Sequence, residues 1–399
     1  MVVSAYVVAE VLGARYLGHS RASYQREVAQ LREQRGRYRR PVVVGEPLQQ
    51  NAASWYRLAL PHLSGWRDDG GSLGTVVKGG SAEYGATITP LVTERCVEAQ
   101  SVRVASALRS THSDWEISAG HLFSFDYTLE ALRLAECLTV DGHRAAYEGD
   151  RRAAARAYVK TLSVGCDFGA GSVMMGMVGV ASAGIGLKAL AQLVMSDEDD
   201  RGLLREMSQQ LSRFEGQLPS AETGLKSERL WLQNALALDG VGSEGERYPG
   251  FGLLLPRRAI AAWHLWREED LLRDLDRVID AHDRREELRL IESIKRRSAK
   301  SGSALVREAR LASDASLALA VDDLLRLYGA VQIAIILQDW RIKHHRYPDD
   351  GSAVRVPLEQ YDLRYEPTQD RLGYKLIGPR AWETADVIIL ERQPTVRAE

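Results

Sequence analysis

The feature that most constrains this chain is a run of 20 consecutive uncharged residues, Phe168–Leu187. Its length is close to that of a membrane span, and small residues recur in it at three- and four-residue steps, at Gly176, Gly179, Ala183 and Gly186. Small residues at this spacing let neighbouring helices approach closely, in a membrane or in a soluble core. Because its many glycines dilute the hydrophobicity of the run, we predict a central buried helix, with a membrane helix as the alternative.

The same run begins with Gly169-Ala170-Gly171, which invites comparison with a phosphate-binding glycine loop. A P-loop has a Lys-Ser/Thr pair after its glycines and a β-strand before them. This sequence has no such pair, and the residues upstream have a helical pattern. We therefore reject a nucleotide-binding loop here.

Apolar residues at helical spacing predict a mainly α-helical chain on both sides of the run. The predicted helices cover residues 20–40, 48–66, 89–109, 122–147, 150–164, 198–238 (two helices separated at Pro219), 256–297 and 303–343. The glycine-rich stretch Asp68–Gly85 is predicted to be a loop.

One predicted connection is typical of a helical hairpin. Glu148-Gly149-Asp150 separates two helices, and alanines flank it on both sides. Small residues next to a tight glycine turn let two antiparallel helices approach closely, as in tetratricopeptide (TPR) repeats. The resemblance covers this hairpin, and no second copy follows at a fixed period. We predict a helical-hairpin, TPR-like body.

The pattern changes after Lys343. A turn-rich segment is followed by three short alternating runs, residues 363–366, 373–377 and 386–391, which are typical of strands. Three short strands need a covering element to be stable. We predict a small α+β module in which about three antiparallel strands pack on a long helix.

This C-terminal order resembles the C-terminal module of type II secretion pseudopilins. The long helix is followed by RIKHHRYPDD, VPLEQYDLRYE, LGYKLIGP and DVIIL. The matched positions are Arg346, Tyr347, Pro348, Val356, Pro357, Tyr365, Gly373, Tyr374, Gly378, Pro379 and Asp386. The wider order, including the Glu-Gly-Asp hairpin, is similar to uncharacterised helical envelope proteins of planctomycete- or myxobacterium-like bacteria.

Two departures limit what this resemblance implies. The chain lacks the apolar N-terminal pilin helix with its processing site, so we do not expect it to assemble as a pilin. It also lacks the loop and acidic cluster that hold calcium in the major pseudopilin, so no calcium site is carried over. We divide the chain into residues 1–19, either a truncated membrane anchor or a first helix, a helical body at 20–320, and a pseudopilin-like tail at 321–399.

Composition excludes few classes of function. The net charge of −2 and a pI near 6.5 give no global field that attracts nucleic acid, and we predict no nucleic-acid partner. Two local basic clusters occur at predicted helix ends, where the helix dipole stabilises cations. The first is Arg35, Arg37, Arg39 and Arg40, and the second is the run 295–302. We interpret both as solvated ends of helices.

The three cysteines, Cys96, Cys137 and Cys166, are too few and too widely spaced for a disulfide scaffold or a zinc knuckle. We expect each to be a small buried apolar residue. A single disulfide stays open as an alternative if the chain is exported, because disulfides persist in oxidising compartments.

No known catalytic motif is present, and we predict no catalytic residue, cofactor or metal site. The strongest catalytic candidates are His112, Asp114 and Glu116, which cluster in a predicted loop and contain a base and two carboxylates. His344 and His345 could form a surface metal or pH-sensing pair, although cations at a helix end explain them sufficiently.

The sequence thus favours a non-enzymatic interaction or scaffold protein of the bacterial cell envelope, with protein partners and peripheral or N-terminal membrane association. One alternative is a hydrolase that uses the His112 loop. Another is a soluble cytoplasmic regulatory protein.

Overall fold

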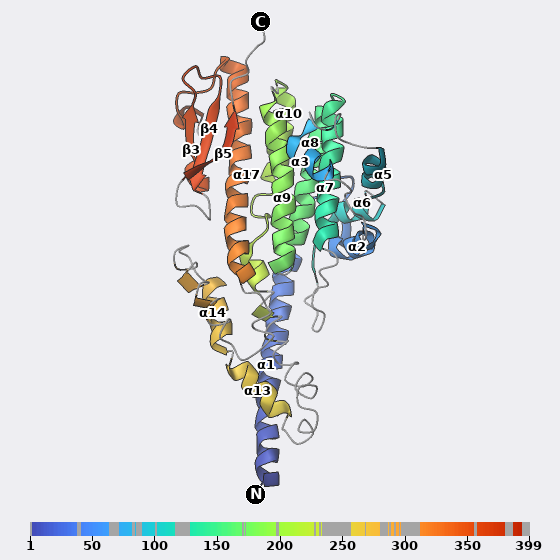
Figure 1. The fold of residues 1–399 in the computed structure, drawn as a ribbon, viewed down its shortest axis with the longest axis vertical. Coiled ribbons are helices and arrows are strands. Elements are labelled where there is room, and N and C mark those ends of the chain that lie inside the picture. Colours follow the sequence, from blue (N-terminus) through green and yellow to red (C-terminus); the bar gives the residue numbers. More distant parts are fainter. Residues whose placement is uncertain are drawn as a thin grey trace.

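A computed structural model shows a mainly α-helical, elongated molecule (Figure 1). It describes residues 2–37, 41–63, 72–81, 84, 90–99, 102–115, 128–169, 171, 173–196, 199–226, 229–230, 233, 257–267, 269–279, six positions between 286 and 296, 312–354, 357–379 and 386–392. The first helix, α1 (Val2–Arg37), and the C-terminal sheet lie towards opposite ends of its long axis (Figure 1).

Four long helices lie side by side and form the body: α7 (Thr128–Tyr147), α8 (Arg151–Gly169), α9 (Val173–Met195) and α17 (Ala312–His344). Helix α9 contacts the other three and lies in the main hydrophobic core. Within the described residues it is also the one helix long and apolar enough to cross a membrane, and 61% of its most apolar window is buried. The predicted central buried helix is confirmed from Val173 onward, whereas Phe168 and Gly169, the first residues of the predicted run, belong to α8.

The small residues of α9 allow this close packing. A Cβ atom at Gly179 would lie 2.4 Å from the backbone nitrogen of Gly169 on α8, and one at Gly165 would lie 2.4 Å from the backbone nitrogen of Ala183. Gly186 approaches the carbonyl oxygen of Tyr158 in the same way. Gly179, Ala183 and Gly186 therefore form a contact surface between α8 and α9, whereas Gly176 faces Leu317 of α17.

The predicted hairpin is confirmed between α7 and α8. Gly149 has a φ of 87°, a conformation that glycine adopts without steric cost. The amide of Asp150 donates to the carbonyl of Ala145 at 2.8 Å, and the Asp150 carboxylate accepts from the amide of Ala153 at 2.9 Å. The same three residues thus end α7 and begin α8.

Farther along the hairpin, a buried histidine joins the two helices. His143 of α7 is fully buried, and its Nδ1 lies 2.7 Å from the hydroxyl oxygen of Tyr158 on α8. Gly142 makes room for this tyrosine, since a Cβ there would lie 2.3 Å from the ring. Burial lowers the pKa of His143 to about 4, so the ring is neutral at pH 7.

This pKa predicts a pH dependence of stability. The folded-state pKa lies below the ordinary value of 6.5, so the unfolded chain binds the proton more tightly and the free energy of unfolding falls as pH drops from 6.5 towards 4. The full loss is about 3 kcal/mol. Urea unfolding across this range should show the slope in the native protein and a shallower one in His143→Gln, which cannot titrate. Parallel slopes in the two proteins would contradict a neutral buried His143.

A smaller layer of short helices and a two-stranded sheet packs beside α7 and α8. Several sequence predictions were wrong in this layer. Residues 48–51 form strand β1 (Leu48–Asn51), not helix, and β1 pairs in parallel with β2 (Ser110–His112). The predicted helix at 89–109 is two helices, α5 (Pro90–Ala99) and α6 (Val102–Arg109). The glycine-rich stretch contains α3 (Ser72–Gly79), so its prediction as a loop was wrong there.

A buried aromatic cluster fixes this layer to α8. The hydroxyl of Tyr56, on α2 (Ala52–Ala59), donates to the carboxylate of Asp167 at 2.8 Å. The indole of Trp115 donates to the Asp167 carbonyl at 2.7 Å, and Phe168 lies against both rings. The side chain of Asn51 caps α2 and also bonds the backbone amide and carbonyl of Asp114.

The cysteines also depart from expectation. Cys96 of α5 and Cys137 of α7 form a disulfide, with Cα atoms 4.8 Å apart. Packing of α5 on α7 brings together two residues that are 41 positions apart in the sequence. All three cysteines are buried as predicted, but Cys96 and Cys137 are paired, which was the alternative to isolated apolar residues, and Cys166 is not part of a disulfide.

The C-terminal module has the predicted architecture. Strands β3 (Arg364–Pro367), β4 (Tyr374–Pro379) and β5 (Asp386–Arg392) form an antiparallel sheet in that order, beside α17 (Figure 1). The core that begins at α8 and α9 continues through α17 into β4 and β5.

At the other end of the molecule, α1 (Val2–Arg37) is one continuous helix that projects beyond the body (Figure 1). Helix α13 (Arg257–Arg267) crosses it at Gly13, where a Cβ would lie 2.5 Å from the backbone of Arg258. Residues 1–19 and 20–40, which the sequence analysis treated separately, therefore share one helix as far as Arg37.

Candidate functional site

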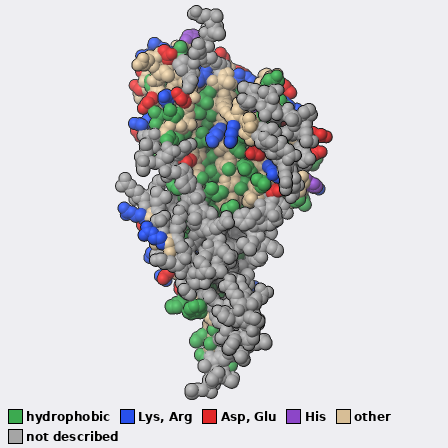
Figure 2. Space-filling view, viewed as in Figure 1, with side chains coloured by type: hydrophobic (Ala, Val, Ile, Leu, Met, Phe, Trp, Pro, Cys, Tyr) green, Lys and Arg blue, Asp and Glu red, His purple; other side chains and the backbone are tan. Residues whose placement is uncertain are grey.

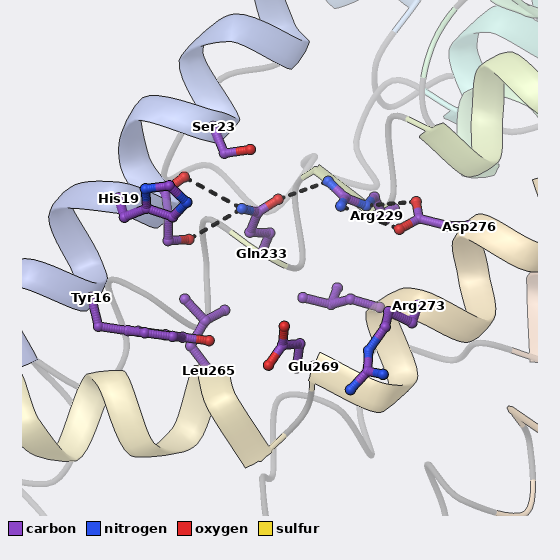
Figure 3. A pocket seen from close by; sticks show the side chains of 11 residues that line it. Tyr16, His19, Ser23, Arg229, Gln233, Leu265, Glu269, Arg273 and Asp276 are labelled. Carbon is purple, nitrogen blue, oxygen red and sulfur yellow. Dashed lines mark hydrogen bonds and ion pairs between the residues drawn. The ribbon is translucent and has the colours of Figure 1, made fainter.

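The candidate functional site is a polar pocket where α1 meets α13 and α14 (Glu269–Ile279) (Figure 3). Its volume is about 250 Å³. The lining residues come from four separate parts of the chain, and they are Tyr16, His19, Ser20, Ser23, Arg229, Gln233, Leu265, Glu269, Leu272, Arg273 and Asp276. Most of these side chains are polar.

Arg229 is the centre of this pocket. Its guanidinium forms ion pairs with Glu27 of α1 and, at 2.8 Å, with Asp276 of α14. It also donates to the side-chain oxygen of Gln233 at 2.8 Å. The side chain of Arg229 is only 16% exposed, so the pairs lie in a partly desolvated environment where charge attraction is stronger than at the surface. One cation thus links α1 to α14.

Gln233 completes the link to α1. Its amide nitrogen donates to the hydroxyl of Ser20 at 3.1 Å, and the residue is buried (Figure 3). Beside this polar contact, Val28 of α1 and Leu230 form a small apolar cluster with Tyr24. A polar and an apolar contact therefore hold the same segment of α1.

On the opposite wall, Tyr16 of α1 lies near Glu269 and Leu265 (Figure 3). Burial, and then the negative charge of Glu269, raise the pKa of the Tyr16 hydroxyl above its ordinary value. The tyrosine is therefore a neutral hydrogen-bond donor at pH 7, not a nucleophile.

The pocket is built for binding or for holding helices together. An activated hydroxyl needs a hydrogen bond to a base, and in Figure 3 no hydrogen bond joins His19 to Ser23. Ser23 instead donates to Glu27 on its own helix at 2.9 Å. The hydroxyls, the carboxylates and the guanidinium groups of Arg229 and Arg273 can form hydrogen bonds with a polar group.

A second, shallower hollow lies on the outer face of β1 and α2. Gln50, Asn51, Ser54, Trp55 and Leu58 line it, with a volume of about 290 Å³. Leu58 is 53% exposed there, and the Trp55 indole donates to Gln50 at 2.9 Å. This combination of an exposed apolar side chain and an aromatic ring is typical of protein-contact surfaces.

His112 and Asp114, which the sequence offered as hydrolase candidates, do not line the pocket. His112 ends β2, and Asp114 follows it after the strand, where its backbone is bound by the Asn51 side chain. Glu116 lies outside the described residues. The neighbouring Ser113 and Trp115 point inward, towards the Asp167 carbonyl, so alternation along the chain places His112 and Asp114 on the other side.

The other sequence candidates lie at the surface or outside the described part of the chain. His344 stacks on Trp340 with ring centroids 3.9 Å apart, and both His344 and His345 are exposed at the end of α17. The side chains of Arg35, Arg37, Arg39 and Arg40, and most of 295–302, are not described. Within the described residues, no three His, Cys, Asp or Glu side chains converge as metal ligands.

No sequence pattern had predicted the residues that line the pocket. Arg229 and Gln233 stand one helical turn apart in a segment rich in leucine, LKSERLWLQN. Polar residues at helical spacing on an otherwise apolar face signal a buried polar contact. Their partners on α1 and α14 are far away in the sequence, and only the fold identifies them.

With this geometry described, the chain can be compared with known proteins. No protein-family model, curated protein or solved structure matches it.

Proposed function

We propose that this chain is a non-enzymatic interaction and scaffold protein of the bacterial cell envelope. The observation that carries the proposal is the arrangement of α1, which projects from the helical body and is held there by the Arg229 ion pairs. An arm fixed to a body, with the three-stranded module at the opposite end, gives one molecule separate contact regions along its length (Figure 1).

Two further observations support a location of this protein in the cell envelope. The Cys96–Cys137 disulfide is typical of proteins in oxidising compartments, such as the periplasm. The resemblance of the C-terminal sequence to pseudopilins points to the same compartment by analogy. The hollow lined by Trp55 and Leu58 is our candidate surface for a protein partner.

Site-specific crosslinking in cells tests this role. A photoreactive amino acid in place of Leu58 should give discrete crosslinked adducts on illumination, whereas the same replacement at Ser208, which is exposed on the polar face of α10 (Arg201–Ser212), should give none. In parallel, a C-terminal tag should become accessible to protease only after the outer membrane is opened.

Two outcomes would contradict this proposal. A tag that stays protected in spheroplasts, on a protein found in the soluble fraction, contradicts an envelope location and favours a cytoplasmic regulatory role. Equal crosslinking at Leu58 and Ser208 would show that the hollow is not a specific contact surface.

A further inference from the structure

The outward face of α1 has two chemically different parts. Near the tip, Val7, Val8, Val11 and Leu12 are exposed, with 55% of Val8 and 60% of Leu12 accessible. At about 100° per residue these four side chains share one side of the helix. No described element of the body covers them, and hydrophobic side chains are visible at this end of the molecule (Figure 2).

Directly after the apolar part, the same side of α1 becomes basic. Arg15, Arg21 and Arg26 are exposed, and helical spacing places Arg15 and Arg26 within the arc of Val7–Leu12 and Arg21 about 40° beyond Val7. The chain as a whole has a net charge of −2, so this positive charge is local.

The acidic residues of this part of α1 are bound to neighbouring segments. Between residues 7 and 30 the only carboxylates are Glu10 and Glu27. Glu10 accepts from the backbone amide of Arg258 at 3.1 Å, and Glu27 pairs with Arg229 in the pocket. The exposed side of α1 from Val7 to Gln30 therefore carries three guanidinium groups and no carboxylate.

We infer that this face of α1 docks on an anionic lipid surface. Val7–Leu12 would lie among the lipid headgroups, and Arg15, Arg21 and Arg26 would pair with lipid phosphates. A helix with an apolar patch beside arginines lies at a membrane interface in this way, because the apolar side chains leave water while the cations stay at the headgroups. The inference rests on the proposed envelope role and names the surface that the arm contacts.

Flotation of the full chain with vesicles tests the inference. The protein should float with vesicles that contain phosphatidylglycerol and remain unbound with pure phosphatidylcholine, and high salt should release it. Val8→Asp with Leu12→Asp should weaken binding roughly 100-fold, since two apolar side chains no longer leave water. Arg15→Gln with Arg26→Gln should weaken it roughly 30-fold, at about fivefold per cation.

Val102→Asp is the matched control, because Val102 is 82% exposed on α6 and lies outside α1. This variant should bind vesicles as the native protein does. All the substituted side chains are exposed, so circular dichroism should show unchanged helicity throughout.

Three results would overturn the inference: no flotation with anionic vesicles, undiminished flotation of Val8→Asp with Leu12→Asp, or a native dimer that this double variant dissociates without any vesicle binding. The last result would identify a second copy of the chain as the occupant of this face. Crosslinking from position 58 is independent of α1, so failure of lipid docking and failure of the scaffold role give different results.

Discussion

Reduction of the Cys96–Cys137 disulfide is expected to lower the free energy of unfolding by about 4 kcal/mol, given the 41-residue separation that it closes. The bond restricts the unfolded chain, and it joins α5 to α7 on the side of the body that carries the small layer. Thermal or urea unfolding with and without a phosphine reductant measures this loss.

Two variants serve as controls for the disulfide. Cys96→Ala with Cys137→Ala should be as unstable as the reduced protein and insensitive to reductant. Cys166→Ala should keep the full response to reductant, because Cys166 is not part of the disulfide. If Cys96 and Cys137 both react with an alkylating agent before reduction, the pairing is wrong, and with it one support for the envelope location.

Gly179→Ala should destabilise the protein by about 3 kcal/mol more than Gly184→Ala, although both change the same residue type on α9. The new methyl group at Gly179 would lie 2.4 Å from the Gly169 nitrogen and 2.6 Å from the Gly165 carbonyl oxygen, so α8 and α9 must separate. At Gly184 the closest neighbour is a methyl group of Leu324 at 3.9 Å, an ordinary contact.

The comparison isolates packing from helix propensity. Replacing glycine by alanine inside a helix favours the helix by about 1 kcal/mol, and this gain applies equally at both positions. Urea unfolding of the two variants and the native protein therefore gives the packing cost directly. Equal stabilities would mean that α8 and α9 are not in close contact at Gly179.

Local sequence patterns predicted the parts of the fold that depend on local chemistry. Glu148-Gly149-Asp150 contains the turn glycine and the capping carboxylate, and both act within a few residues. The three C-terminal strands alternate in burial because one face packs on the core, and β4 shows that period directly. Helix α9 followed from a run of uncharged residues long enough to cross the core.

Features that depend on distant partners could not be predicted in this way. Strand β1 needs β2 as its pairing partner, and β2 lies some 60 residues later in the sequence. The Asn51 side chain likewise bonds the backbone of Asp114, 63 residues away. Arg229 bonds Glu27 across 202 residues, and no local pattern connects them. Helix α3 did leave a signal, since Leu73 and Val76 have helical spacing and are buried, but the surrounding glycines obscured it.

The continuity of α1 also has a mechanical consequence. A helix rises about 1.5 Å per residue, so the distance from Val8 at the tip to Glu27 at the Arg229 ion pairs is roughly 30 Å. An unbroken helix resists bending over that length, and α13 braces it at Gly13. The arm therefore keeps a fixed direction relative to the body, so a surface bound along the side of α1 from Val7 to Arg26 would also fix the orientation of the body.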